Sequence, residues 1–154
     1  MPGLSDGQEL SRISVRAVVN AMVVAAGVIE RDGRFLVTQR QAGVHLEGFW
    51  EFPGGKCEAG ETLDSCLTRE LQEELGVDAH IGEEVCKTLH EYADRSVELH
   101  FLKCELLGEP KPQLGQAMSW VAREELASLS FPSADLELIR ILTQGRERQT
   151  ERKK

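Results

Sequence analysis

The segment between Gly54 and Gly76 constrains this chain more than any other part of the sequence. Its apolar residues recur every four positions, at Leu63, Leu67, Leu71 and Leu75. That spacing predicts a helix from Thr62 to Leu75 with one apolar face. Asp64 in the first turn suits the helix dipole, and Gly76 is a natural terminator.

The same helix has an acidic face. At about 100° per residue, Glu70, Glu73 and Glu74 fall on one side. Like charges at these spacings destabilise a helix, and the helix contains no lysine to offset them. Glu74 also lies beside the leucines, where burial is expected. A solvated acidic face is the simplest interpretation, whereas a bound cation would relieve the repulsion. Ligands that are all oxygen favour Mg²⁺ or Mn²⁺ over zinc.

The residues before the helix favour the cation. Gly54, Gly55 and Gly60 form a glycine-rich loop, and Glu61 lies between this loop and the helix. Such a loop lets the backbone approach a ligand closely and offers carbonyl oxygens to a metal.

At this point the sequence resembles the Nudix box, G-x5-E-x7-R-E-U-x-E-E-x-G-U, where U is a bulky aliphatic residue. Nine constrained positions match over 23 residues: Gly55, Glu61, Arg69, Glu70, Leu71, Glu73, Glu74, Gly76 and Val77. The resemblance implies the Nudix fold, an α/β (α+β) architecture with a mixed β-sheet sandwiched between α-helices. It also implies Mg²⁺-dependent cleavage of a nucleoside diphosphate linked to another group, with Mn²⁺ as a substitute ion.

The roles implied by the resemblance fall on the box itself. Gly55, Glu70, Glu73 and Glu74 are the expected metal ligands. Arg69 is expected to orient the helix carboxylates together with Glu61, and Glu70 is the first choice for the base that deprotonates the attacking water.

The flanks are similar to the MutT branch, which hydrolyses nucleoside triphosphates to monophosphate and pyrophosphate. The similarity covers roughly residues 18–143 and includes Gln39-Arg40, the run from Gly48 to Lys56, and the run from Phe131 to Asp135. It implies five substrate contacts: Arg40 to phosphate, and Phe52, Tyr92, Arg95 and Asp135 to the nucleotide.

Each of these five residues also has an ordinary structural interpretation. Arg40 can end a strand as a solvated charge, and Arg95 can be a turn residue. Phe52 and Tyr92 can be sheet residues. Asp135 lies in the first turn of the expected last helix, where the dipole favours any acidic side chain.

One position departs from the MutT-like pattern. Several such enzymes carry a further metal-linked Glu in a late loop, where this chain has Leu114. No acidic residue occurs from Lys111 to Ala122. The helix glutamates then act alone, or Glu109 or a water substitutes.

The rest of the chain predicts a single α/β unit. Asp32-Gly33 joins two strands as a hairpin, and Phe49–Phe52 is a short strand that Pro53-Gly54-Gly55 ends. Further strands are expected at 83–92, 96–106 and 118–121, with a short helical piece at 123–129. The last helix should start near Ser133 and bury Leu136, Ile139 and Leu142.

The expected organisation is a loose leader at 1–15, a hydrolase domain at 16–145 and a basic disordered tail at 146–154. The chain of 154 residues carries a net charge of −8, and its last nine residues carry +3. The remaining −11 disfavours stable nucleic-acid binding, which depends on neutralising phosphates. A small polyphosphate bridged by metal ions remains compatible.

Cysteine usage and hydropathy predict the compartment. The four cysteines, Cys57, Cys66, Cys86 and Cys104, lack CxxC spacing and are expected to be reduced, mostly buried thiols. The apolar run from Ala17 to Ile29 lacks a convincing cleavage site and is too short to span a bilayer. These features predict a cytoplasmic protein without membrane contact, either a monomer or a homodimer.

The sequence therefore predicts a nucleoside triphosphate pyrophosphohydrolase. The first-choice substrate is an oxidised purine such as 8-oxo-dGTP. The alternatives are CTP or another pyrimidine triphosphate, an ADP-ribose-type dinucleotide, and a non-catalytic nucleotide sensor.

Overall fold

The computed structural model describes the backbone of residues 21–153 and the side chains of residues 21–144. The predicted leader at 1–15 lies outside the described residues. Within them, seven strands form one mixed sheet with the order β3-β2-β1-β6-β5, to which β4 adds beside β1 and β7 beside β2. The strands are β1 (Ala21–Arg31), β2 (Arg34–Gln39), β3 (Trp50–Glu51), β4 (Gly54–Lys56), β5 (Ala79–Glu91), β6 (Ser96–Leu106) and β7 (Met118–Ala122).

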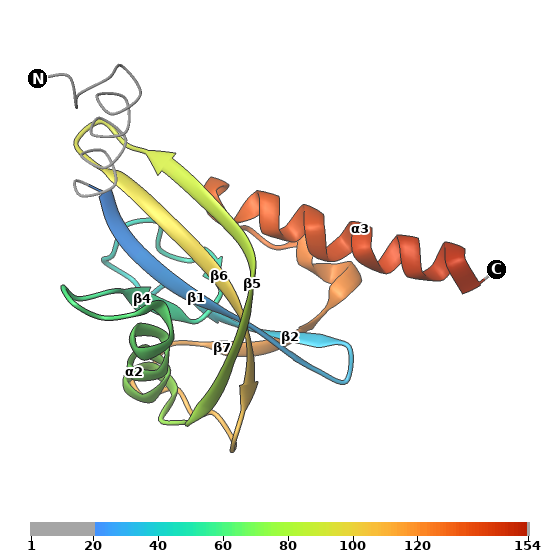
Figure 1. The fold of residues 1–154 in the computed structure, drawn as a ribbon, viewed down its shortest axis with the longest axis horizontal. Coiled ribbons are helices and arrows are strands. Elements are labelled where there is room, and N and C mark those ends of the chain that lie inside the picture. The colour runs from blue at the N-terminus through green and yellow to red at the C-terminus, as the bar shows by residue number, and fades with distance from the viewer. Residues whose placement is uncertain (1–20, 154) are drawn as a thin grey trace, which may run out of the picture.

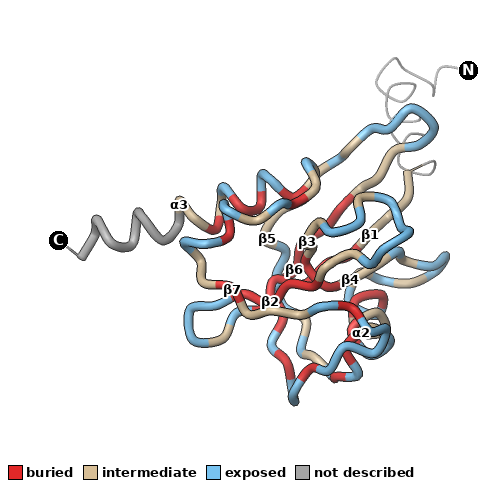
Figure 2. The backbone as a smooth tube through the Cα atoms, turned by 180° about the vertical axis from the view of Figure 1, so that it is seen from behind, coloured by how far each residue is buried: buried red, intermediate tan, exposed pale blue. Residues whose placement is uncertain are grey.

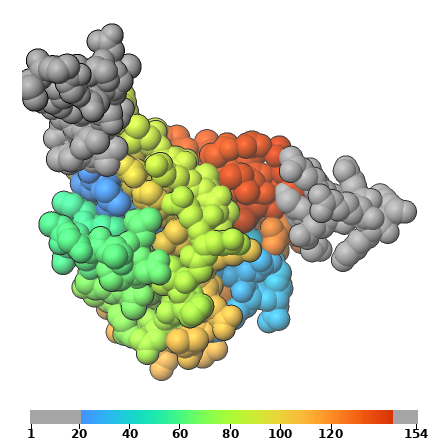
Figure 3. Space-filling model, viewed as in Figure 1, coloured from blue at the N-terminus to red at the C-terminus, as the bar shows by residue number. Residues whose placement is uncertain are grey.

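Helices cover both faces of this sheet, as expected (Figure 1). The helix α2 (Leu63–Leu75) packs its leucines on one face. The other face is covered by α3 (Leu136–Lys153) and by two short 3₁₀ helices, η1 (Arg123–Ser128) and η2 (Ser133–Asp135). Figure 2 shows the buried residues gathered in the middle of the sheet and on the helix faces that meet it. Figure 3 shows α2 and β5 lying side by side, with α3 at the opposite end of the molecule.

The β1–β2 hairpin forms where the Asp32-Gly33 turn was expected. Both turn residues have positive φ, 51° at Asp32 and 77° at Gly33, which a two-residue hairpin turn requires. The longest pairing of β1 is parallel, with β6, from Ala21–Ser96 to Ile29–Cys104. This parallel pair brings the start of β1 and the start of β6 to the same edge of the sheet.

Three sequence expectations need correction. Leu136 does not face the core: it is 55% exposed, and Leu138 is fully buried in its place. The cause is η2, which occupies residues 133–135 and sets the phase of the helix that follows, so that Leu138, Ile139 and Leu142 face the sheet. Second, the short strand β3 does end before Pro53 as expected, but Gly54 and Gly55 are not part of a loop: with Lys56 they form β4, antiparallel to β1.

The third correction concerns the cysteines. Cys57 and Cys66 form a disulfide, whereas Cys86 and Cys104 are free. The loop after β4 folds back on the first half of α2, which brings the two sulfurs together although they are nine residues apart. The expectation of four reduced thiols is therefore wrong for this pair.

At the carboxyl end, α3 continues as backbone helix through Lys153, across most of the predicted tail at 146–154. The side chains of that stretch lie outside the described part, and the domain boundaries stay a prediction. No helix within the described residues is both long and apolar enough to cross a membrane.

Candidate active site

The helix α2 carries most of the candidate site. Thr62 caps its start and exchanges hydrogen bonds with Ser65 in a capping box, and Gly76 ends it in the left-handed conformation. Because Leu67, Leu71 and Leu75 are fully buried under the helix, its acidic residues turn toward β4 and the solvent.

Gly55 on β4 lies directly against Glu70. A Cβ atom at position 55 would stand 2.3 Å from Glu70 Oε2, closer than any real contact. A Cβ at Gly54 would similarly stand 2.0 Å from the backbone oxygen of Ala25. The two glycines therefore allow β1, β4 and the Glu70 carboxylate to stack without intervening side chains.

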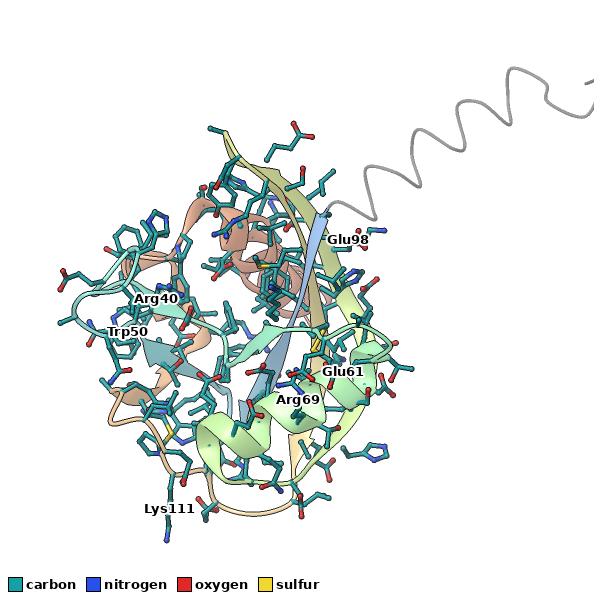
Figure 4. The ribbon with its side chains drawn as sticks, turned by 90° about the vertical axis from the view of Figure 1, so that its left-hand side faces the viewer. Arg40, Trp50, Glu61, Arg69, Glu98 and Lys111 are labelled. Carbon is teal, nitrogen blue, oxygen red and sulfur yellow. A yellow bond between two sulfur atoms is a disulfide. The ribbon has the colours of Figure 1, made fainter. Side chains whose placement is uncertain are left out.

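Arg69 is the centre of the hydrogen-bond network on α2. Its guanidinium donates to both oxygens of Glu61 at 2.7 and 2.9 Å, to Glu70 at 2.9 Å and to Glu73 at 3.2 Å. It also donates to the Lys56 carbonyl at 3.0 Å, which joins the end of β4 to α2. These bonds to Arg69 lower the pKa of Glu61 to about 2. Figure 4 shows Glu61 and Arg69 together at α2.

Glu74 is the most deeply placed carboxylate of the helix. Its oxygens accept hydrogen bonds from the Gly54 amide at 3.2 Å and from Thr38 at 3.3 Å. Burial, reinforced by the negative charge of Glu51, raises its pKa to about 7. Burial also raises the pKa of Glu70. Two carboxyl groups with raised pKa therefore lie beside β4, Glu70 against Gly55 and Glu74 against Gly54.

Glu73 differs from its two neighbours because its side chain is 60% exposed and points to solvent beside Arg69. Among the described residues, no three acidic, histidine or cysteine side chains converge in a geometry that already fits a metal ion. Cation binding at this helix therefore requires the glutamates to change rotamer, with Arg69 releasing Glu70 or Glu73.

A cavity of about 640 Å³ opens beside this carboxylate cluster. Phe52 forms its inner wall and stacks on Phe131, with ring centroids 5.4 Å apart. Asp135 also lines the cavity and is only 6% exposed. Burial, with a further contribution from Glu51, raises the pKa of Asp135 to about 7. The cavity thus joins a flat apolar wall to one carboxyl group that gains or loses a proton near neutral pH.

The remaining predicted substrate residues line the same cavity. Arg40, Tyr92 and Arg95 all contribute to its wall. Arg40 is held by an ion pair with Glu51 at 2.9 Å and by the carbonyl oxygen of His45. Tyr92 and Arg95 bracket the turn between β5 and β6, where the Tyr92 amide donates to the Arg95 carbonyl at 2.7 Å.

The loop that contains Leu114, where the chain departs from the MutT-like pattern, lies at the carboxyl end of α2. Leu114 is 61% exposed and lines a small cavity together with Glu74 and Gln116. Gln116 is buried and donates to the backbone carbonyl of Glu74 at 3.1 Å, while the Gln113 amide donates to the same carbonyl at 2.9 Å. This loop therefore supports the end of α2 through neutral amide groups.

Glu51 is the residue that sequence reasoning missed. It lines the cavity, holds Arg40, and raises the pKa of both Glu74 and Asp135. The strand that contains it was recognised, but a charged residue beside a tryptophan on a two-residue strand gives no signal of its environment. Thr38, fully buried on β2 and bonded to Glu74, was also missed, because its place on a strand gives no signal of the carboxyl group that it contacts.

Comparisons with known proteins agree with this geometry. The family model described as NUDIX domain matches residues 24–140. A CTP pyrophosphohydrolase of Escherichia coli is 38% identical over 117 residues, which cover 75% of this chain and 87% of that protein. An 8-oxo-dGTP diphosphatase of Haemophilus influenzae is 40% identical over 118 residues, with the same coverage of 75% and 87%.

Solved structures give the same result. The solution structure of the E. coli ORF135 protein superposes with a TM-score of 0.75 at 36% identity, covering 82% of this chain and 91% of that one. A MutT protein of Staphylococcus aureus superposes with a TM-score of 0.69 at 32% identity, covering 81% and 97%. The family match spans most of the chain and includes the complete box on β4 and α2, so the chain belongs to the Nudix hydrolases, in their MutT-like branch.

Proposed function

We propose that this protein hydrolyses a nucleoside triphosphate to a nucleoside monophosphate and pyrophosphate, with Mg²⁺ as its ion and Mn²⁺ as a substitute. The observation that carries the proposal is the contact between two regions: the crowded carboxylates at Gly55 and the aromatic cavity that contains Asp135. The first region suits a metal-bound polyphosphate, and the second suits a flat base. Two relatives, a CTP pyrophosphohydrolase and an 8-oxo-dGTP diphosphatase, are named for nucleoside triphosphate substrates, which supports this assignment.

Four groups would hold the divalent ion: the Gly55 carbonyl oxygen and the carboxylates of Glu70, Glu73 and Glu74. Nudix hydrolases as a family use a divalent metal, and the donor set here fits one. Glu74 is buried beside Glu51 and Glu70, so its negative charge is disfavoured until a cation arrives. Because all the donors are oxygen atoms, Mg²⁺ and Mn²⁺ are favoured. A bound divalent ion neutralises phosphate charge and lowers the pKa of water.

The protein groups then have separate roles. Glu70 is the proposed general base for the attacking water, since its carboxylate lies against Gly55 and burial raises its pKa above the ordinary value. Arg69, fixed by Glu61, holds Glu70 and Glu73 in the metal-free protein and gives up one of these two ion pairs when the cation binds. The water attacks the β-phosphorus and the bond from it to the oxygen shared with the α-phosphate breaks. The nucleoside monophosphate leaves with that oxygen, and pyrophosphate carries the oxygen of the water.

The cavity sets the choice of base. Phe52, backed by its stack on Phe131, provides an aromatic wall, and ionised Asp135 accepts hydrogen bonds from N–H donors. An oxidised purine such as 8-oxo-dGTP presents the N7–H donor that guanine lacks and is the first substrate we propose. CTP is the second candidate, because its exocyclic amine also donates to a carboxylate. An ADP-ribose-type substrate finds no dedicated feature in the cavity.

A nucleotide panel tests the proposal. We expect Mg²⁺-dependent release of pyrophosphate, without free phosphate, from 8-oxo-dGTP or CTP, and at least about ten-fold lower kcat/KM for dGTP and UTP, the discrimination expected when one buried acceptor loses its donor. Turnover of ADP-ribose above both triphosphates would overturn the substrate assignment. Nucleotide binding with no turnover on any substrate would identify a sensor instead of an enzyme.

A further inference from the structure

A disulfide lies inside the segment that carries the candidate metal site. Cys57 follows β4, two residues after Gly55, and Cys66 lies in α2, four residues before Glu70. Cys66 is fully buried, whereas Cys57 is partly exposed. The bridge therefore joins the loop that directly follows β4, the strand that carries the Gly55 carbonyl, to the helix that carries the glutamates.

The buried sulfur also touches the candidate metal-binding group itself. Cys66 Sγ lies 3.9 Å from the Gly55 carbonyl oxygen, and Glu70 packs against the same glycine. Gly55 is thus held between a sulfur atom and a carboxylate, both from α2. A chemical change at Cys66 Sγ therefore alters the surroundings of the carbonyl oxygen that the proposed function assigns to the metal.

We propose that the Cys57–Cys66 pair is a redox site. Its disulfide fixes β4 and the loop after it on α2, and its reduction weakens divalent-metal binding. This inference rests on the proposed function, because it takes Gly55, Glu70 and Glu74 as the metal-binding groups.

The reaction is a thiol–disulfide exchange with a dithiol. A thiolate of the dithiol attacks Cys57 Sγ, the more accessible sulfur, and the bond to Cys66 breaks. Cys66 leaves as a thiolate and takes a proton. The second thiol of the reagent then displaces Cys57, which is protonated in turn. Two electrons and two protons reach the protein, and the dithiol becomes a cyclic disulfide.

Two consequences of reduction act in the same direction. First, the loop loses its covalent attachment to α2. It keeps the hydrogen bonds from the Cys57 amide to Val23 at 2.8 Å and from Arg69 to Lys56, and it gains mobility around them. Second, Cys66 acquires an S–H donor 3.9 Å from the Gly55 oxygen, where the disulfide sulfur had none. This donor competes with a cation for the carbonyl oxygen.

The other two cysteines are poorly placed to take part. Cys86 is partly exposed and lies on β5, not on β4 or α2. Cys104 is buried, and burial raises its pKa to about 12, so its thiolate is scarce. Cys86→Ser is therefore a suitable control variant.

The first test establishes the bond. Protein oxidised with glutathione disulfide and then alkylated with iodoacetamide should yield linked peptides containing Cys57 and Cys66, and label at Cys86. After dithiothreitol, all accessible thiols should be labelled and the linked peptide should disappear. Alkylated Cys57 and Cys66 in the oxidised sample would overturn the proposal.

The second test measures metal binding without substrate. Calorimetric titration with Mn²⁺ should give about ten-fold weaker binding for reduced protein, freed of dithiothreitol, than for oxidised protein, as expected when support for a metal ligand is lost. Cys57→Ser should bind Mn²⁺ like the reduced form in either buffer, and Cys86→Ser should respond to reduction as the unmodified protein does. Equal Mn²⁺ affinity in both redox states overturns the redox site alone. Absence of Mn²⁺ binding in both states overturns the metal site and, with it, the proposed function.

Discussion

Replacing Gly55 with alanine isolates the contact between the loop and Glu70. The added Cβ would stand 2.3 Å from Glu70 Oε2 and 2.4 Å from its Cδ, whereas real Cβ atoms essentially never come within 3.0 Å of another heavy atom. The carboxylate must therefore retreat by at least the difference, 0.7 Å. No left-handed backbone conformation is involved at Gly55, so the substitution acts through this contact.

The expected effect is large on activity and small on folding. A displacement of about 1 Å in a catalytic group costs about 100-fold in rate, so kcat should fall by about that factor. The displaced atoms are the end of a flexible side chain, so the metal-free protein should lose at most about 1–3 kcal/mol of stability, the usual cost of overpacking. Gly54→Ala contrasts with it: its Cβ would meet backbone atoms of β1, which cannot move away, and should destabilise the sheet itself.

Steady-state pyrophosphate release, Mn²⁺ calorimetry and thermal unfolding together measure these effects. Gly108→Ala is the matched control, since its Cβ would meet only Val77 at an ordinary 3.6 Å, and it should leave all three measurements unchanged. If Gly55→Ala retains the kcat and the Mn²⁺ affinity of the unmodified protein, then the position of Glu70 against Gly55 has no part in catalysis and the site as described is wrong.

Three further predictions address the carboxyl groups. Glu73→Gln should lower kcat by at least about ten-fold through weaker metal binding, and chelator should abolish activity in the unmodified protein. The raised pKa of Glu74, about 7, means that its contribution to the stability of the metal-free protein is present below its unfolded value of 4.5 and is lost as the pH rises to about 7. Thermal unfolding without metal should therefore show a falling melting temperature over this range, with a smaller slope in Glu74→Gln. Asp135→Ala should lower kcat/KM about ten-fold for the preferred base and little for others, measured over four bases; an unchanged ranking would leave Asp135 as a residue that only supports the helix start.

Local patterns in the sequence were sufficient to predict most of the fold. The leucine spacing in α2 and the Asp32-Gly33 turn each depend on neighbours within a few residues, and both elements formed near their expected places. The prediction that Leu136 is buried was wrong because the 3₁₀ helix η2 sets which residues of α3 face the sheet. The position of η2 depends on packing rather than on the periodicity of the sequence. The strand β4 was not predicted because glycines have low strand propensity. Here their lack of a side chain is what permits the pairing with β1.

The candidate site divides in the same way. The box residues are close in sequence on one helix and its preceding loop, so their grouping followed from helical geometry. The environment of Asp135 did not, because its raised pKa arises first from burial, through the packing of η2 on the sheet, and then from Glu51 on a distant strand. The Cys57–Cys66 disulfide also required the loop to fold back on α2, a path that residue spacing alone leaves open.

The charge distribution explains how so acidic a chain can accept a polyanion. Residues 1–145 carry a net charge of −11, which opposes the approach of a triphosphate at long range. At physiological ionic strength such repulsion is screened beyond about 8 Å, so the side chains within that distance dominate inside the cavity. The cavity that contains Phe52 is lined by three cationic side chains, Arg40, Lys56 and Arg95, and by three carboxyl groups, those of Glu51, Asp94 and Asp135. The cavity wall thus offers cationic groups to the phosphates, while the carboxylates at Gly55 require a divalent ion before the same phosphates can lie beside them.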